Sequence, residues 1–416
     1  MNSRAESLLR PLSRWLGAAA VVAGATVLPA AAWAAPTPDA VGQALAAAVT
    51  ATGETKLTYG AASGSGGTVT LTDVRITRAE PAAAPAAPAA PSGGTAAAPA
   101  STTAPAAPAV GTVTIPALVF TGIADRAGGG FTAAHLSVDK GSAVARGETI
   151  AWATGSVDDV VVPSAAEVTA RAKVQPFDKF SLAGITMSGA HLASPITIDA
   201  VAGTIGNLTG AAPAAVHWEA HGIKLDSTLL ADSFLGAFIA LLDYKSVNAD
   251  VVFDGTWDTT ADSVTLTSLA VSAPDMGKIT VSGKVRGFSA RRLSDPAVAK
   301  EARAAATLDG VSLRFDNAGF VEHMLDMQAQ MLGGTRDDVR TQLTGSALPF
   351  FLGFVKNAAF RDSAQQAIGA FLANPHSLTI TSSASAPVPL GEAMRSALHA
   401  PGTIPDLLRL SIAANN

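Results

Sequence analysis

The stretch Leu182-Ala183-Gly184-Ile185-Thr186-Met187 is one copy of a six-residue pattern that recurs along the chain: apolar, any, small or acidic, apolar, any, apolar. Five further copies begin at Leu71, Val157, Ala220, Leu266 and Leu308. The second half of each copy alternates with the two-residue period of a β-strand. The small or acidic third residue interrupts that period, as a β-bulge or a strand crossover does. The pattern therefore predicts a chain built from repeated strands.

Three consecutive segments give the clearest strands in the sequence. Val247–Trp257, Val264–Val271 and Ile279–Val285 each alternate apolar and polar residues, and turn-forming sequences separate them. This spacing predicts an antiparallel meander. Because Phe253 and Trp257 share strand parity, we expect both side chains to lie on one buried side of the meander.

The first 34 residues are predicted to be a signal peptide. Arg4, Arg10 and Arg14 supply a basic beginning, Trp15–Leu28 is an apolar core without charges, and Ala32-Trp33-Ala34 offers a cleavage site. An uncleaved membrane anchor is the alternative, because the apolar stretch is nearly long enough to span a bilayer. Either way, the leader predicts a location in the Gram-negative cell envelope, and cleavage makes the mature chain periplasmic.

Composition excludes some classes of function. The chain has 28 Lys and Arg residues against 33 Asp and Glu, a net charge of −5, and so lacks the basic surface that nucleic acids require. It has no cysteine, so an oxidising compartment gives it no disulfides. Mean hydropathy is +0.32. This apolarity reflects either an alanine-rich composition or an apolar surface hidden in a groove.

Three regions follow the leader. Residues 35–316 are predicted to be a β-rich repeat region, and residues 317–416 a mostly helical C-terminal region with one or two closing strands. Residues 80–109 are almost entirely Ala, Pro, Gly, Ser and Thr, which predicts a disordered loop inserted between two strands. Within the C-terminal region, Phe350–Phe360 and Ala364–Leu372 are predicted helices, and no segment after the leader is long enough to span a bilayer.

One predicted helix interrupts the strands at Leu229–Leu242. Its apolar residues cover more than half of the helix circumference, so it is either buried in the core or lies across an apolar groove or a membrane surface. Under the groove hypothesis, the side chains that face an apolar ligand are Phe234, Leu235, Phe238 and Leu241.

The strongest candidate for a metal site is His217-Trp218-Glu219-Ala220-His221. Alternation predicts a strand, which places His217, Glu219 and His221 on one face, and this donor set suits Zn²⁺ or Fe(II). Same-face neighbours on a strand are about 7 Å apart, so a solvated polar face is the preferred interpretation and no metal is predicted. Four acidic residues recur at four-residue spacing and could form a calcium site: Asp250, Asp254, Asp258 and Asp262. We prefer the interpretation that they serve in turns and at an edge strand.

Other catalytic motifs are missing. The sequence contains no G-x-S-x-G, no P-loop and no dinucleotide-binding fingerprint. We therefore predict no catalytic residue and no cofactor.

The recurring motif resembles that of two groups of bacterial envelope proteins, the AsmA-like group and the looser YdgA-like periplasmic proteins. The resemblance rests on Leu182–Met187, on Leu308–Leu313 and on the meander Val247–Val285, behind an N-terminal leader. It implies strands stacked into a long curved sheet with an apolar groove, and a role in lipid transport or envelope maintenance. It transfers no functional residue.

Together these features predict a β-rich α+β fold: repeated antiparallel strands forming an elongated curved sheet or groove, with a helical C-terminal region. We expect a non-enzymatic periplasmic protein that holds a lipid or another apolar ligand in the groove. The alternative is an envelope scaffold or partner-binding protein without a small ligand. A metal-dependent hydrolase using His217, Glu219 and His221 ranks third. The expected partners are lipids or envelope proteins.

Residues 80–109 should be dispensable for folding. They carry no large apolar side chain that could join a core, and closing a shorter loop costs little free energy. Replacing them with a short Gly-Ser linker should leave the melting temperature within a few degrees of the wild type. A large drop in a thermal melt would show that the segment packs against the fold.

Overall fold

The computed structural model describes residues 36–79, 110–145, 147–170, 172–190, 192–209, 212–230, 239, 242, 244–287, 306–383 and 387–416. The predicted signal peptide and the Ala/Pro segment 80–109 lie outside these residues. No helix in the described ranges is long and apolar enough to cross a bilayer.

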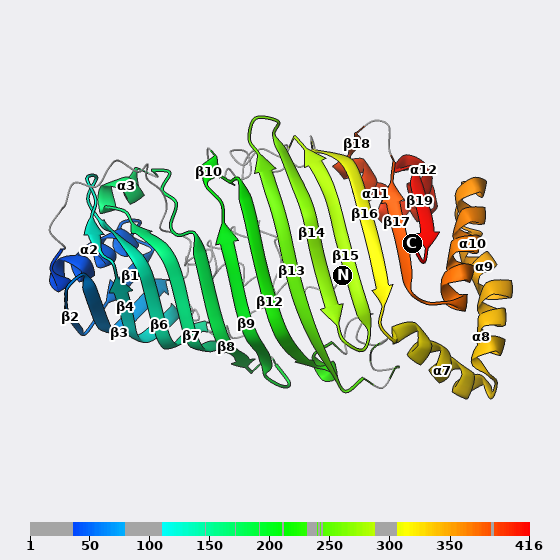
Figure 1. Cartoon of the computed structure of the whole chain (residues 1–416), viewed down its shortest axis with the longest axis horizontal. Coiled ribbons are helices and arrows are strands. Elements are labelled where there is room, and N and C mark those ends of the chain that lie inside the picture. The colour runs from blue at the N-terminus through cyan, green and yellow to red at the C-terminus, as the bar shows by residue number, and fades with distance from the viewer. Residues whose placement is uncertain are drawn as a thin grey trace, which may run out of the picture.

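Seventeen strands form one open antiparallel sheet whose strands lie across the long axis of the molecule (Figure 1). This confirms the predicted fold class. The strands of the first half are β1 (Thr55–Thr58), β2 (Ala61–Ser65), β3 (Thr68–Ala79), β4 (Val110–Thr121), β5 (Ala124–Asp125), β6 (Phe131–Ala145), β7 (Glu148–Val162), β8 (Lys179–Gly189) and β9 (Ile196–Ile205). Those of the second half are β12 (Ala215–Asp226), β13 (Ser246–Asp258), β14 (Ser263–Ala273), β15 (Gly277–Arg286), β16 (Thr307–Asn317), β17 (Ser377–Ser382), β18 (Val388–Pro389) and β19 (Leu410–Ala414).

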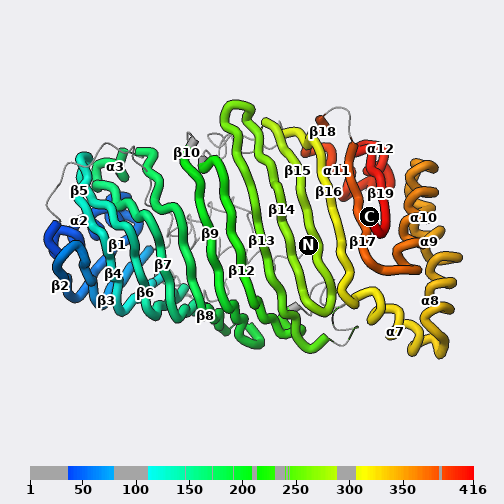
Figure 2. The backbone as a smooth tube through the Cα atoms, in the orientation of Figure 1, coloured from blue at the N-terminus to red at the C-terminus, as the bar shows by residue number. Residues whose placement is uncertain are grey.

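The sheet is a meander, because nearly every long strand pairs with the one that follows it (Figure 2). Both β1 and β2 pair with β3, and β4 pairs with β6. At the other end, β17 and β18 both pair with β16, and β19 pairs with β17. Between β9 and β12 the short strands β10 (Leu208–Thr209) and β11 (Ala212–Pro213) form a separate ladder.

The third residue of the recurring motif marks a backbone irregularity in every copy. In four copies it has a positive φ, between 51° and 63°: Asp73, Asp159, Gly184 and Gly222. In the copy at Leu266 a register shift between β14 and β15 spans Ser268, and in the last copy the shift between β15 and β16 adjoins Gly310. These positions confirm the predicted interruption of the strand period. Asp and Gly suit the left-handed positions because both enter that conformation at low cost.

The irregularity keeps apolar residues on one face. In β12, Ala220 lies opposite Val251 and Ile223 lies opposite Ala249. Strand β13 alternates without interruption there, so Val251 and Ala249 point to the same side. The extra residue around Gly222 therefore returns Ile223 to the face of Ala220, where strict alternation would have placed it on the opposite face.

Helices cover this apolar face at the N-terminal end of the sheet. Helix α2 (Pro38–Thr50) buries Val41, Leu45 and Ala48 against a strand core that includes Leu71, Phe120 and Phe131. The rings of Phe120 and Phe131 meet edge to face with centroids 5.4 Å apart. A short helix, α3 (Ala165–Thr169), follows β7 and begins with a capping box between Ser164 and Glu167.

A second set of helices follows at the C-terminal end: α7 (Phe320–Leu332), α8 (Arg336–Gln342), α9 (Leu348–Leu352), α10 (Ala358–Ala373), α11 (Leu390–His399) and α12 (Ile404–Leu407). Of these, α7, α8 and α10 cover the same apolar face on β16 and β17, and α11 and α12 pack on β16. Leu325, Val339 and Phe371 form a buried cluster packed by Phe315 of β16 and Leu378 of β17. The helix predicted over Phe350–Phe360 is wrong in part, because the chain leaves α9 after Leu352 and re-enters a helix at Ala358.

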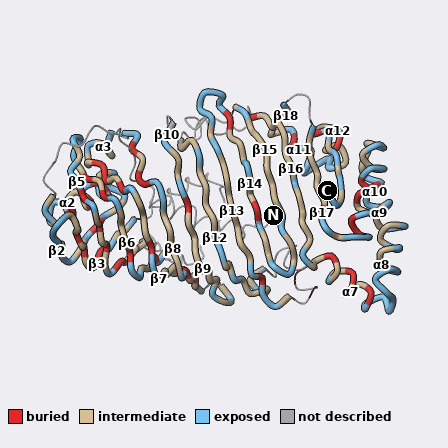
Figure 3. Tube along the Cα trace, viewed as in Figure 1, coloured by how far each residue is buried: buried red, intermediate tan, exposed pale blue. Residues whose placement is uncertain are grey.

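The middle of the sheet is different. Among the described residues, its buried cluster, Ile185, Ile198 and Ala220, and the half-buried side chains packed on it come from strands β7 to β12. Figure 3 shows buried residues concentrated toward the N-terminal end and in the C-terminal helices, whereas most residues of β12 to β16 are intermediate or exposed. Among the residues that the structure describes, the sheet thus has one apolar face that helices cover at both ends and that is least covered between them.

Gly184→Ala should be destabilising. Gly184 has a φ of 62°, and a Cβ there would lie 2.8 Å from the Cβ of Ala153 on the neighbouring strand. The left-handed conformation alone costs a non-glycine residue about 1–2 kcal/mol, and the contact adds to that. We expect a loss of about 2–3 kcal/mol in the free energy of unfolding, measured by urea denaturation.

Gly369→Ala is the matched control. Gly369 lies within α10, and a Cβ there meets no atom within 4 Å. Alanine has the higher helix propensity, so this variant should be neutral or more stable by up to about 1 kcal/mol. Equal losses in both variants would contradict a special role for the bulge position.

Candidate functional site

Two rows of apolar side chains cross five strands in the second half of the sheet. Cross-strand pairing places Trp218, Phe253, Leu269, Val281 and Leu313 in one row, and Ala220, Val251, Val271, Ile279 and Phe315 in the next. We call these ten residues of β12 to β16 the central apolar face. Strand spacing of about 4.8 Å makes each row about 19 Å long.

The central apolar face is partly open to solvent. Val271, Ile279 and Leu313 are 42%, 47% and 41% exposed, and they lie on the adjacent strands β14, β15 and β16. Trp218 and Phe253 are half-buried and stack with ring centroids 6.0 Å apart. A contiguous apolar patch of this kind is typical of a binding surface.

The expectation that Phe253 and Trp257 lie on a buried side is therefore wrong in part. The two share a face, as their parity predicts, but both are only half-buried. Alternation identified the apolar side of the meander, but it could not show whether a second layer covers that side. Sequence analysis also did not single out Val271, Ile279 and Leu313, although their alternation with polar residues was visible.

The predicted metal donors lie on the opposite, polar face of β12. The Nδ1 of His217 is 2.6 Å from Oδ1 of Asp254, its direct cross-strand partner. The Nε2 of His221 is 3.3 Å from Oε2 of Glu219. The structure thus brings the three predicted residues together and adds Asp254, which sequence analysis assigned to a different candidate.

The same pairing occurs elsewhere on the polar face. His135 of β6 lies opposite Asp158 of β7, again with Nδ1 and Oδ1 2.6 Å apart. Cross-strand pairs of opposite charge stabilise antiparallel sheets, so the repeated geometry favours a structural role. Within the part of the chain that the structure describes, no group of three or more His, Cys, Asp or Glu residues could hold a metal ion.

Three of the four acidic residues considered for calcium have separate partners. Asp250 accepts a hydrogen bond from the backbone N–H of Gly222, and Asp254 pairs with His217. Asp258 accepts from the N–H groups of Ala261 and Thr260, and these bonds hold the pKa of Asp258 below its usual value. The contacts of Asp258 fit the preferred turn function, whereas Asp250 and Asp254 lie on β13, which pairs on both sides and is not an edge strand.

The four side chains predicted to face an apolar ligand, Phe234, Leu235, Phe238 and Leu241, lie outside the described residues. The residues described beside them include Ile239 and Leu242, which are both buried. The Nε2–H of His323 on α7 donates to the carbonyl oxygen of Leu242 over 2.7 Å. This contact links residue 242 to the first of the C-terminal helices.

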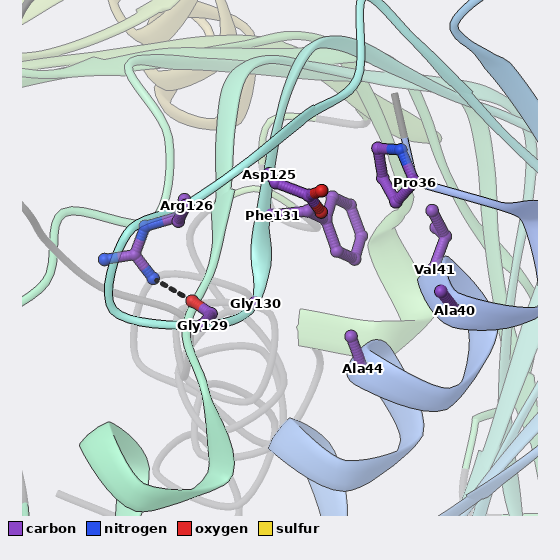
Figure 4. Close-up of a pocket in the computed structure, with 9 residues that line it drawn as sticks. All are labelled: Pro36, Ala40, Val41, Ala44, Asp125, Arg126, Gly129, Gly130 and Phe131. Carbon is purple, nitrogen blue, oxygen red and sulfur yellow. Dashed lines mark hydrogen bonds between the residues drawn. The ribbon is translucent and has the colours of Figure 1, made fainter. Parts of the chain in front are cut away.

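A hollow of about 370 Å³ lies at the N-terminal end of the sheet, between α2 and the β5–β6 hairpin (Figure 4). Pro36, Ala40, Val41, Ala44 and Phe131 form its apolar side. The side chain of Arg126 also lines the hollow.

Arg126 is already occupied by protein partners. Its two terminal nitrogens lie 3.0 and 3.1 Å from the carboxylate oxygens of Glu167, and Nη1 also donates to the carbonyls of Gly129 and Val162. The Arg126 side chain is only 8% exposed. This part of the hollow therefore functions as a structural clamp between the hairpin and α3.

The Glu167→Gln variant should weaken this clamp. Partial burial raises the pKa of Glu167, but hydrogen bonds from Arg126 and Ser164 outweigh it and hold the pKa below its usual value. The ionised pair therefore stabilises the fold above the unfolded-state pKa of about 4.3, and this contribution is lost as the pH falls through the lower folded-state value. At pH 7 the variant should lose about 1–3 kcal/mol. The difference from wild type in urea denaturation should shrink in acid; a pH-independent difference would contradict this account.

Comparison with known proteins adds one match. A family model described as "Uncharacterized protein" matches residues 270–415. This stretch contains β15 to β19 and the helices α7 to α12, and therefore the C-terminal part of the central apolar face with the helices beside it. No curated protein and no solved structure matches the chain.

Proposed function

We propose that this chain is a non-enzymatic envelope protein that holds a lipid acyl chain, or an apolar ligand of similar shape, against the central apolar face. The observation that carries the proposal is the solvent exposure of Val271, Ile279 and Leu313 on three adjacent strands. Their neighbours in the two rows are apolar as well, so a ligand lying along a row would meet apolar atoms throughout.

The dimensions of the face suit an acyl chain. A row of about 19 Å exceeds the thickness of one hydrocarbon leaflet, which is about 15 Å. Complete burial of an aliphatic side chain contributes about 1.5–3 kcal/mol, so covering three side chains that are less than half exposed contributes about 2–4 kcal/mol. Further contact with the Trp218–Phe253 stack would add to this value.

The arrangement of polar groups supports binding over catalysis. The His and Asp side chains of β12 and β13 lie on the opposite face, where each imidazole already has a carboxylate neighbour. An apolar ligand on the central apolar face would therefore be separated from them by the sheet. The predicted leader and the resemblance to AsmA-like and YdgA-like proteins add support for a periplasmic location and a lipid ligand.

Wild-type protein purified from its native envelope should carry lipid, detected by native mass spectrometry and by solvent extraction. The double variant Ile279→Asp with Leu313→Asp should lose at least about nine-tenths of it, because a buried carboxylate without a partner opposes acyl-chain contact. Both sites are more than two-fifths exposed, so the fold should survive.

Ser282→Asp is the matched control. Ser282 lies on β15, opposite Ser312 and on the polar face of the same strand that carries Ile279. This variant should keep its lipid and its melting temperature. If the wild type carries no lipid, or if the double variant retains it, the lipid proposal fails. A wild type without lipid would leave the envelope scaffold as the better hypothesis.

A further inference from the structure

Three phenylalanine side chains are uncovered at one tip of the molecule. Phe350, Phe351 and Phe354 are each 67% exposed. The ring of Phe350 meets those of Phe351 and Phe354 edge to face, with centroids 5.7 Å apart in both pairs. Scattered exposed apolar residues are normal on proteins, but three exposed aromatic rings joined by contacts through Phe350 form a patch that marks an interaction site. We call these residues the α9 tip.

The backbone that carries the α9 tip is held in place. Leu352, between the phenylalanines, is buried, and the N–H of Gly353 donates to the carbonyl of Pro349. After the tip, the N–H of Lys356 donates to the carbonyl of Gly402, and the side chain of Asn357 caps α10 by accepting from Phe360. The rings are therefore presented by an ordered turn that is tied to a distant part of the chain.

The chain segment that carries the tip holds cations, and two acidic residues border it: Asp362 follows Arg361, and Asp406 accepts a hydrogen bond from Asn357. Between Val339 and Arg361 the sequence contains Arg340, Lys356 and Arg361 and no Asp or Glu. Arg340 forms an ion pair with Asp337, which leaves Lys356 and Arg361 as the cations beside the phenylalanines. Lys356 is exposed. Aromatic rings flanked by Lys and Arg are the combination found at membrane–water interfaces.

We propose that the α9 tip docks on an anionic lipid bilayer. The three rings enter the interfacial layer, and Lys356 and Arg361 lie at the level of the lipid phosphates. Figures 1 and 2 place α9 at the C-terminal extreme of the elongated sheet, so docking would bring that end of the molecule to the membrane. The inference does not depend on what the central apolar face binds.

Vesicle co-sedimentation of the purified full chain tests the proposal. The wild type should bind vesicles of phosphatidylethanolamine with phosphatidylglycerol, and should bind vesicles of phosphatidylcholine alone more weakly. The triple variant Phe350→Ser, Phe351→Ser and Phe354→Ser should bind the anionic vesicles at least about tenfold more weakly, because it lacks the three rings whose transfer from water into the bilayer favours binding. Lys356→Gln should weaken binding to the anionic vesicles and reduce its salt dependence.

Met331→Ser with Leu332→Ser is the matched control, because these residues at the end of α7 are 70% and 59% exposed and lie outside the tip. It should bind as the wild type does. The proposal is overturned if the wild type binds neither vesicle, if the triple variant binds unchanged, or if the control loses as much binding. A protein partner captured without vesicle binding would also overturn it.

Two further measurements distinguish a loss of membrane docking from unfolding of the variant and from a failure of the proposed lipid binding. A thermal melt checks that the triple variant is folded, as its exposed positions predict. Lipid extraction from the same variant reports on the central apolar face, and its lipid content should equal that of the wild type. Loss of vesicle binding with retained lipid would support the tip and leave the proposed function untouched.

Discussion

The structure depends on a single backbone constraint: each long strand that carries the motif is interrupted without losing its apolar side. Strict alternation through the strand would turn the apolar residues after the interruption toward solvent. An extra residue, in a left-handed conformation at Gly184 and Gly222 or at a register shift near Ser268, resets the parity. The cost is local strain, which Gly and Asp bear at low energy.

A one-sided sheet has to cover its apolar face. At the N-terminal end α2 does so through Val41 and Leu45, and at the C-terminal end α7, α8 and α10 do so around Leu325. In β12 to β16 most side chains on the same face are half-buried or exposed, although Ala220 is buried. The polar face needs no cover, because antiparallel sheets tolerate water on one side and cross-strand pairs such as His135–Asp158 stabilise it.

The two proposed surfaces differ in chemistry. The central apolar face is mainly aliphatic, and its polar neighbours lie on the far side of the sheet, which suits a chain-like apolar ligand. The α9 tip is small, aromatic and flanked by Lys356 and Arg361, which suits the polar–apolar boundary of a bilayer. Their position on one elongated sheet would place a lipid-binding surface beside a membrane contact.

The sequence by itself determined where the strands of the meander lie and where their alternation is interrupted. The strand period predicted the meander now seen as β13 to β15, and the small or acidic third residue predicted the interruptions. These features depend on interactions within a few residues, which a sequence pattern records directly.

Only the tertiary structure decided which surfaces are open and which side chains meet. The half-exposure of Phe253 and Trp257 depends on whether another segment forms a second layer, and strand alternation carries no information about that layer. His217 meets Asp254 because β12 and β13 pair in one register, which fixes partners that lie 37 residues apart. The phenylalanines of the α9 tip are exposed, and the turn that follows them is held by a hydrogen bond from the N–H of Lys356 to the distant carbonyl of Gly402. Each of these outcomes rests on contacts between segments far apart in sequence, and local patterns do not specify such contacts.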